Sequence, residues 1–407
     1  MSIRDIATPW PLVPLRTVVR LNPETLPEDT DPDREFSYID IGSVTAGQID
    51  RTEEMRFEHA PSRARRVVRD GDVLVSTVRT YLRAVAGVGS THDGQVASTG
   101  FAALRPDTEA ADPRFVRYWC LSEPFVSEVV GRSTGVSYPA INASGVVRLP
   151  IPLPPVRTQQ HVADYLDRET QRIDELVLKN DRMLALLAER RRALVDAELR
   201  TASSGESTRL RRLLRTAPSY GVLKPEPDNG DDGVPLLRVL DLTDRNEVLA
   251  EQVMRIRRQQ ATEYQRTTLA AGDVLLSVVG TLGRGLIVPR EFEAANVSRA
   301  LARLQVRDWV DPRWLLRWFE STQFIEQVAA STYGTAQAVL NMGDLSRYAI
   351  PTPPEGAGSA LDRLDGLLGH QDGLAGRVEA QSKLLRERRQ ALITAAVTGQ
   401  LDIGEAA

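Results

Sequence analysis

The stretch Gly71-Asp-Val-Leu-Val-Ser76 recurs 201 residues later as Gly272-Asp-Val-Leu-Leu-Ser277. A glycine and an aspartate ahead of a run of branched apolar residues are typical of a turn that leads into a buried strand. We therefore interpret Asp72 and Asp273 as turn residues rather than as general bases. A motif that returns at such a distance indicates that a larger unit of the chain is duplicated.

Four further blocks recur in the same order, each 198 or 199 residues apart. They are Tyr38-Ile-Asp-Ile41 with Leu236-Leu-Arg-Val239, Asp112-Pro-Arg-Phe115 with Asp311-Pro-Arg-Trp314, Ile151-Pro-Leu-Pro-Pro155 with Ile350-Pro-Thr-Pro-Pro354, and Glu189-Arg-Arg-Arg-Ala-Leu194 with Glu387-Arg-Arg-Gln-Ala-Leu392. The 407 residues are thus predicted to form two tandem units of about 200 residues each.

Each unit begins with a β-rich section. In the first, β-branched runs with Gly and Asp between them predict strands over residues 36–44, 72–78 and 96–104. Asp112 and Asp311, each followed by proline, are typical N-caps of a helix. Trp119 and Trp318 lie at matching positions of these helices, and we expect both in the core, with Cys120 as a small buried residue. A proline-rich strand exit closes each section.

A long helix is predicted after each proline-rich exit, because apolar residues recur every seven positions. The expected seam residues are Leu166, Ile173, Asn180, Leu187 and Leu194 in the first helix, and Leu364, Val378, Leu385 and Leu392 in the second. The companion row is expected three positions further on, at Leu176 and Met183 for example. Asn180 is a polar seam residue of the kind that fixes pairing register, although a solvent-facing position is an alternative.

The predicted fold class is α+β, with two pseudo-symmetric repeats, each a β-rich domain followed by a long helix. A two-fold relation between the repeats would pair the two helices as an antiparallel coiled coil. At ~1.5 Å per residue, such a helix would be a spacer of roughly 65 Å. The predicted segments are residues 1–155 (first domain), 156–205 (central helix), 206–354 (second domain) and 355–407 (C-terminal helix).

Composition excludes several classes of protein. Only Lys179, Lys224 and Lys383 are lysines among 51 basic residues, and none follows a glycine, so a GK[ST] phosphate loop is absent. None lies two residues after an acid, as a (D/E)-x-K nuclease ending requires. No apolar run reaches the ~20 residues of a membrane span, and one cysteine excludes a disulfide framework. We therefore expect a cytoplasmic protein with no membrane segment.

Catalytic and metal-binding signals are weak. The Asn/Asp/Ser-Pro-Pro-aromatic signature of adenine methyltransferases does not occur, and the four histidines are scattered without recurrence between units. Gly280-Thr-Leu-Gly-Arg-Gly285 lies at a strand end with no βαβ continuation, which favours a turn over a cofactor loop. We predict no catalytic residue, no cofactor-binding residue and no metal ligand in this chain.

Arginines gather around the Gly-Asp motif of both units, although the net charge is −4. Such side chains form bidentate contacts with guanine edges and phosphates, and tyrosines nearby can contact bases. The alternative is a solvated charged face. The candidate DNA-binding residues are Arg63, Arg65, Arg66, Arg69, Arg79, Tyr81, Arg83 and Tyr138 in the first unit, and Arg255, Arg257, Arg258, Tyr264, Arg266, Arg284 and Tyr333 in the second.

The whole pattern resembles the specificity subunits of Type I restriction-modification systems. The residues that carry the resemblance are Ile151-Pro-Leu-Pro-Pro-Val-Arg-Thr-Gln-Gln160, Ile173-Asp-Glu-Leu176, Glu189-Arg-Arg-Arg-Ala-Leu194, the two Gly-Asp-Val-Leu blocks, and the segments 135–142 and 334–341. The resemblance spans both halves and is specific in combination.

The resemblance implies two target-recognition domains, each reading one half of a split site in double-stranded DNA, and helices that set the gap. It implies two methyltransferase (modification) subunits and restriction/translocase subunits as partners, with S-adenosylmethionine and ATP used by those partners. Two other hypotheses stay open on the sequence: a stand-alone DNA methyltransferase or nuclease with cryptic motifs, and a coiled-coil scaffold that binds only protein.

Overall fold

The computed structural model describes residues 3–135, 138–228, 230, 232–243, 246–332 and 339–403. It separates into two compact units, described one at a time below. Unit 1 comprises residues 1–181 and 379–407, and unit 2 comprises residues 182–378. Each unit therefore takes a part of both long helices, α4 (Val156–Ala202) and α9 (Gly358–Val397).

The β-rich part of unit 1, which we call the first head, contains two main sheets and a short two-stranded one. The sheet orders are β2-β10-β7-β8-β4, β5-β3-β9-β6 and β1-β11. Its elements are β1 (Leu12–Pro14), β2 (Val19–Leu21), β3 (Glu35–Ile39), β4 (Ala46–Gly47), β5 (Glu53–Arg56), β6 (Ala64–Val67), β7 (Val73–Ser76), β8 (Val85–Gly87), β9 (Val96–Ser98), β10 (Phe101–Pro106), α1 (Pro113–Leu121), α2 (Glu123–Gly131), α3 (Ala143–Val146) and β11 (Pro150–Pro152).

The second head, in unit 2, repeats this plan. Its sheet orders are β13-β19-β16-β17, β15-β14-β18 and β12-β20. Its elements are β12 (Ser207–Arg209), β13 (Ser219–Tyr220), β14 (Val234–Leu237), β15 (Met254–Ile256), α5 (Arg258–Glu263), β16 (Val274–Ser277), β17 (Gly285–Ile287), β18 (Asn296–Val297), β19 (Leu301–Leu304), α6 (Pro312–Phe319), α7 (Thr322–Thr332), α8 (Met342–Arg347) and β20 (Ala349–Pro351).

Strand register confirms that the two heads are structural repeats. Ser76 of β7 lies opposite Phe101 of β10, and Ser277 of β16 lies opposite Leu301 of β19, both in antiparallel pairs. The parallel pairs β3–β9 and β14–β18 also correspond. The predicted α+β class with two β-rich repeats is therefore confirmed.

Two predicted strands differ from the observed ones. The run over residues 36–44 stops being a strand after Ile39, because the Asp40 side chain accepts a hydrogen bond from Gly42 and starts a 3-10 turn. The run over residues 96–104 is split into β9 and β10 by a turn in which the Gly100 N–H donates to Ser98 Oγ. Both errors arise where a short polar side chain binds the local backbone.

The predicted helix starts are confirmed. Asp112 Oδ1 accepts hydrogen bonds from the backbone N–H groups of Arg114 and Phe115, at 2.8 and 3.3 Å. Asp311 Oδ1 accepts one from Arg313 at 2.9 Å. These carboxylates satisfy amide groups that have no partner within the helix.

The predicted core residues are also buried. Trp119, Trp318 and Cys120 are completely inaccessible to solvent. Burial raises the pKa of the Cys120 thiol, so the side chain stays a neutral, small core residue.

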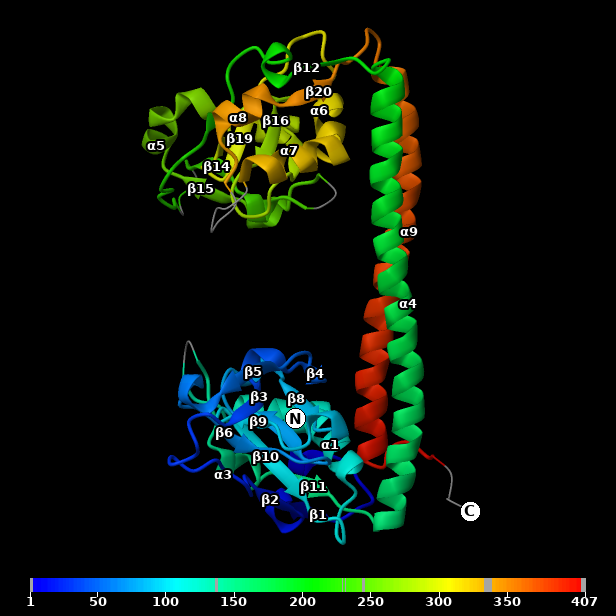
Figure 1. The fold of residues 1–407 in the computed structure, drawn as a ribbon. Coiled ribbons are helices and arrows are strands. Elements are labelled where there is room, and N and C mark those ends of the chain that lie inside the picture. The colour runs from blue at the N-terminus through cyan, green and yellow to red at the C-terminus, as the bar shows by residue number, and fades with distance from the viewer. Residues whose placement is uncertain are drawn as a thin grey trace. The chain divides into compact units, whose positions relative to one another are not determined.

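Within each unit, α4 and α9 run side by side and antiparallel (Figure 1). In unit 1, Asp174 pairs with Arg389 and the Asn180 amide donates to Ser382 Oγ at 3.1 Å. In unit 2, the pairs Arg191–Asp372 and Glu198–Arg363 run in the same opposed sense. Asn180 therefore makes a polar contact with the partner helix.

The predicted seam residues are buried or half-buried, but the predicted companion row is wrong. Leu166, Ile173, Leu364 and Val378 are buried, and Asn180, Leu187, Leu194, Leu385 and Leu392 are half-buried. Leu176 and Met183, three positions after a seam residue, are exposed, whereas Val177 and Leu184, four positions after one, are half-buried. Steps of three and four residues both follow one helix face, so only the contacts decide between them.

Both helices contribute to each core. The core of unit 1 joins Phe115 and Trp119 to Leu166 of α4 and to Ile393 and Val397 of α9. In unit 2, an equivalent core contains Trp314 and Trp318 together with Val195 and Leu199 of α4 and Leu361, Leu364 and Leu368 of α9. Each head is therefore completed by the end of the helix that belongs to the other sequence repeat.

Candidate nucleic-acid interface

The buried aspartate of the repeated Gly-Asp motif makes an ion pair in each head. Asp72 pairs with Arg105 of β10 at 2.8 Å, and Asp273 pairs with Arg303 of β19 at 2.6 Å. Each carboxylate also accepts a hydrogen bond at 2.8 Å from the backbone N–H three residues earlier. The turn interpretation is confirmed, and each aspartate anchors a strand that is followed by candidate DNA-binding residues, Arg79 in the first head and Arg284 in the second.

Two arginines that precede the motif in the first head bind acids of the same head. Arg63 donates to the Tyr38 hydroxyl at 3.4 Å and lies 3.3 Å from Asp40, contacts that raise the pKa of its guanidinium. Arg69 forms a 2.8 Å ion pair with Glu24. These two guanidinium groups are held in defined positions by partners within the head.

Arg65 and Arg66 lie on β6 between those two. The Arg65 guanidinium stacks 4.7 Å from the centroid of the Phe57 ring. Arg66 donates to the Thr25 hydroxyl at 3.2 Å and is half-buried, and burial lowers the pKa of its guanidinium. The structure thus gives these two arginines no carboxylate partner among the described residues.

The strand end after β7 meets the segment after α2. Val78 bridges to Ala140, and the Ile141 N–H donates to the Thr77 carbonyl at 2.8 Å. We call the described residues of 77–83 and 133–141 the first loop pair. Its surface carries three predicted residues that are far apart in sequence: Arg79, Tyr81 and Tyr138.

These three side chains form an exposed cationic and aromatic surface. The Arg79 guanidinium lies 4.7 Å from the centroid of the Tyr138 ring. Tyr81 is 52% exposed and Tyr138 is 65% exposed. By contrast Arg83, the fourth predicted residue, is held by both oxygens of Glu123, at 2.6 and 2.9 Å. Arginine with aromatic side chains is a combination suited to bases and their stacking faces.

The predicted arginines of the second head are spread along β15, α5 and the chain after it. Arg255 donates to the Gly233 carbonyl at 3.0 Å, Arg257 pairs with Glu226 at 3.2 Å, and Arg258 donates to the Asp232 carbonyl at 3.4 Å. Tyr264 is half-buried against an apolar cluster that contains Val222 and Ile256, and the Arg266 side chain is exposed. In this cluster Arg255, Arg257 and Arg258 are therefore held by partners within the head, whereas the Arg266 side chain is exposed to solvent.

The second head also has a loop pair, formed by residues 278–284 and 339–341. Val279 bridges to Val339, and the Leu340 N–H donates to the Val278 carbonyl at 2.9 Å. Arg284 donates to the Leu242 carbonyl at 3.3 Å. Tyr333, and with it most of the segment 334–341, lies outside the described residues.

Two exposed side chains at the loop pairs escaped the sequence reasoning. Leu82 lies beside Tyr81 and is half exposed, and Tyr220 is exposed while its hydroxyl donates to the Leu340 carbonyl at 3.3 Å. Leu82 is adjacent to predicted residues and was within reach of the sequence signal. Tyr220 lies far from the Gly-Asp motif of the second unit in sequence, so only the fold reveals its place beside the second loop pair.

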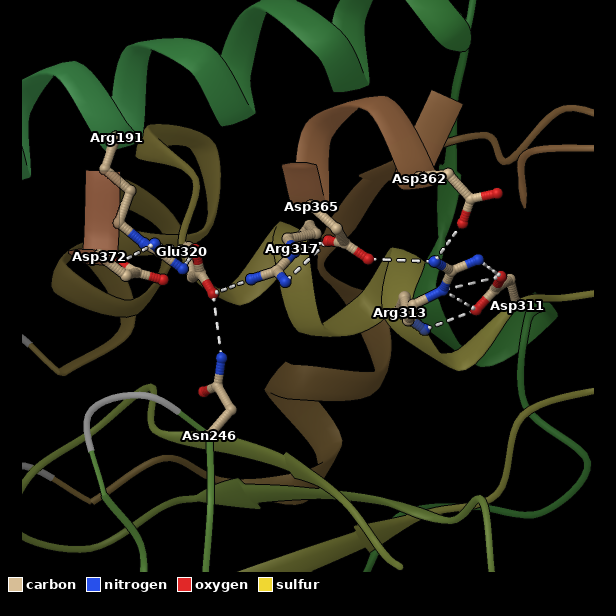
Figure 2. Close-up of polar contacts among 9 residues, drawn as sticks. All are labelled: Arg191, Asn246, Asp311, Arg313, Arg317, Glu320, Asp362, Asp365 and Asp372. Atoms are coloured by element: carbon tan, nitrogen blue, oxygen red, sulfur yellow. Dashed lines mark hydrogen bonds and ion pairs between the residues drawn. The ribbon is translucent and has the colours of Figure 1, made fainter. Parts of the chain in front are cut away.

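A second duplicated feature, the head–helix clamp, joins each head to a long helix. In unit 1, Arg114 contacts Asp112, Asp164 and Asp167 at 3.2, 2.6 and 3.0 Å. In unit 2, Arg313 contacts Asp311, Asp362 and Asp365 at 2.8, 2.7 and 3.0 Å (Figure 2). The partners recur at the repeat distance, so the clamp is a property of the duplicated unit.

The clamp of unit 2 extends along α9. Arg317 contacts both Asp365 and Glu320 at 2.8 Å, and Glu320 contacts Arg191 of α4 at 3.0 Å. Arg191 in turn pairs with Asp372 at 2.7 Å, and the Asn246 amide donates to Glu320 at 3.2 Å (Figure 2). One continuous set of ion pairs thus orients the second head on both helices.

Glu24 gives the first head a pH-dependent contact. Hydrogen bonds from Arg69 and then Arg105 lower the pKa of Glu24 from 4.5 to about 2. Unfolded chains take up this proton as the pH falls below 4.5, whereas the folded head keeps the carboxylate ionised down to about pH 2. The stabilisation is therefore complete above pH 4.5 and declines as the pH falls towards 2.

We expect the free energy of unfolding of the wild-type protein to exceed that of Glu24→Gln at pH 7. The difference should shrink steadily between pH 4.5 and pH 2, because glutamine does not titrate. Urea unfolding followed at several pH values measures it. A difference that stays constant over this range would contradict the role of the Glu24 carboxylate.

The described residues contain no group of three or more His, Cys, Asp or Glu side chains placed to hold a metal ion. Within the same part of the chain, no helix is both long enough and apolar enough to cross a membrane.

Comparison with known proteins identifies similar chains, although no family model matches. Over 304 residues the chain is 24% identical to the specificity subunit of the Type I restriction enzyme EcoBI from Escherichia coli, covering 68% of this chain and 64% of that protein. Over 131 residues it is 24% identical to the HindI specificity subunit of Haemophilus influenzae, covering 32% of this chain and 28% of that one. The match therefore spans less than two thirds of the E. coli protein.

A solved structure extends the similarity to almost the entire chain. A protein chain from work on complex assembly and conformational transition of the type I R-M system aligns with a TM-score of 0.65 and 25% identity. The alignment covers 97% of this chain and 100% of that one. The resemblance inferred from the sequence is confirmed: the chain is similar to specificity subunits of Type I restriction enzymes and, over almost its whole length, to a chain of the type I R-M system.

Proposed function

We propose that the chain is the non-catalytic DNA-recognition subunit of a Type I restriction-modification complex. Each head reads one half of a split target in double-stranded DNA. The observation that carries the proposal is the duplication of one scaffold with two different surfaces. The strand register, the ion pair of the Gly-Asp motif and the head–helix clamp recur in both heads. The arginine and aromatic side chains on their loops differ.

Local charge rather than net charge supports DNA binding. Residues 1–155 carry 17 basic and 20 acidic side chains, and residues 206–354 carry 19 and 18. Affinity for phosphates must therefore come from the positions of individual arginines and from partner subunits. The exposed Arg79, Tyr81 and Tyr138 of the first loop pair are such a local group.

The partners follow from the family. Two methyltransferase subunits would dock on the long helices, and restriction/translocase subunits would join them, with S-adenosylmethionine and ATP bound by these partners. The exposed apolar side chains of α4 and α9, such as Leu186 and Leu384, support protein contacts along the helices.

Different loops imply different half-sites. The first loop has the sequence Arg79-Thr-Tyr-Leu-Arg-Ala84, and its counterpart is Gly280-Thr-Leu-Gly-Arg-Gly285. Side chains that reach base edges decide which bases are accepted. The target is therefore proposed to be asymmetric, with the two halves separated by a gap of fixed length.

Exchange of one head tests the proposal. We expect that replacing residues 206–354 by those of a related specificity subunit changes one half of the methylated motif and leaves the other half and the gap unchanged. The measurement is sequencing of methylated bases in cells that carry the matching methyltransferase subunit. The reciprocal exchange of residues 1–155 is the matched control and should change the opposite half. Changes in both halves after a single exchange would refute modular reading.

A further inference from the structure

Arg79 adopts a left-handed backbone conformation, and a glycine, Gly280, occupies the corresponding position of the second head. Its φ is +48°, in the left-handed region, and the corresponding Gly280 of the second head has a φ of +77°. The two positions match because both follow a residue that forms the same bridge, Val78 with Ala140 and Val279 with Val339. The fold therefore demands a left-handed residue here, and the first head uses one with a Cβ, which is unfavourable.

The Arg79 guanidinium makes no hydrogen bond or ion pair with any residue that the structure describes. It stacks on Tyr138, whose ring is 65% exposed, and no carboxylate of the described residues lies within ion-pair distance. Arg83, also left-handed at φ +55°, differs because both its terminal nitrogens bind Glu123. A strained backbone position whose side chain makes only a stacking contact with an exposed ring is characteristic of a residue retained for an external ligand.

We propose that Arg79 reads a guanine in the half-site of the first head. This inference rests on the proposed function of DNA recognition. Guanine presents two acceptors, O6 and N7, on its major-groove edge, and the planar guanidinium donates to both at once. Stacking on Tyr138 holds the guanidinium plane before DNA arrives, which reduces the conformational freedom lost on binding.

The test is Arg79→Gly in the complete complex with methyltransferase subunits. We expect methylation of the wild-type target to fall about 10- to 100-fold, the effect of one bidentate base contact. On a library of targets with randomised half-sites, the preference for guanine at one position of one half should disappear, while the other half keeps its preferences. The Tm should not fall, because glycine relieves the backbone strain at position 79. This relief compensates for the lost stacking contact with Tyr138.

Two variants separate base reading from other roles. Ala294→Gly relieves a left-handed residue (φ +67°) in the second head and should leave all base preferences unchanged. Arg79→Lys keeps the charge but not the planar fork, and should weaken the guanine preference without abolishing it. If Arg79→Gly weakens all targets equally and leaves the guanine preference intact, Arg79 contacts phosphate and the inference is wrong.

The outcome is distinguishable from failure of the proposed function. If Arg79→Gly changes no preference while head exchange still changes one half of the motif, DNA recognition stands and only the role of Arg79 is refuted. If head exchange changes neither half, the proposed function itself fails.

Discussion

Replacing Arg303 by alanine is expected to reduce the free energy of unfolding of the second head by about 3–5 kcal/mol. The Asp273 and Arg303 side chains are only 7% and 9% exposed, and they lie 2.6 Å apart. Removal of the arginine leaves a carboxylate buried beside β16 without its counter-charge. Hydrogen exchange of the β16 and β19 amides, together with urea unfolding, measures the loss.

Two comparisons show whether the loss comes from the unpaired charge. The double change Asp273→Asn with Arg303→Met removes both charges and keeps an acceptor for the Ala270 N–H, so it should recover most of the stability. Arg347→Ala breaks an exposed pair with Asp344 and should cost at most about 1 kcal/mol. If the double variant is as unstable as Arg303→Ala, the unpaired charge is not the cause.

Replacing Arg313 by alanine is expected to cost about 2 kcal/mol and to reduce methylation roughly tenfold or more. This arginine neutralises three aspartates at once, two of them on α9 and one at the start of α6. Without it, Asp311 and Asp362 lose this ion pair, Asp365 keeps only its contact with Arg317, and α6 is held less firmly on α9. The loss of methylation follows because a misplaced head presents its loops in the wrong position.

The control for the clamp is Arg363→Ala. Arg363 also belongs to α9, but it is 65% exposed and pairs only with Glu198. Its loss should change the unfolding free energy by less than about 1 kcal/mol and leave methylation near the wild-type level. Equal effects of the two substitutions, measured by urea unfolding and by methylation of the target, would show that the clamp has no special role.

Features encoded over a few residues were predictable. The Gly-Asp turn at Asp72, the N-cap at Asp112 and the burial of Trp119 were all read correctly from the sequence. Each depends on residues that are neighbours in the chain, so a short motif contains the whole signal. The two misplaced strand ends, after Ile39 and at Gly100, depend on local side-chain hydrogen bonds that compete with the strand pattern.

The candidate interface was predictable only as a set of residue types. The arginines around each Gly-Asp motif look alike in sequence, yet the fold binds Arg69 to Glu24 and Arg83 to Glu123 and leaves Arg79 stacked on an exposed ring. Those partners lie 40 to 60 positions away in the chain. No periodicity or spacing reports contacts of that kind.

The sequence by itself determined that this protein is a duplicated head and helix, because repeated motifs can be recognised from the order of residues without knowledge of their contacts. Tertiary structure alone decided which helix end completes which head: Ile393 and Val397 of the second repeat lie in the core of the first head. It also decided which arginines are neutralised within the heads. The physical reason is that burial and charge pairing depend on distances in space, which chain folding sets between residues remote in sequence.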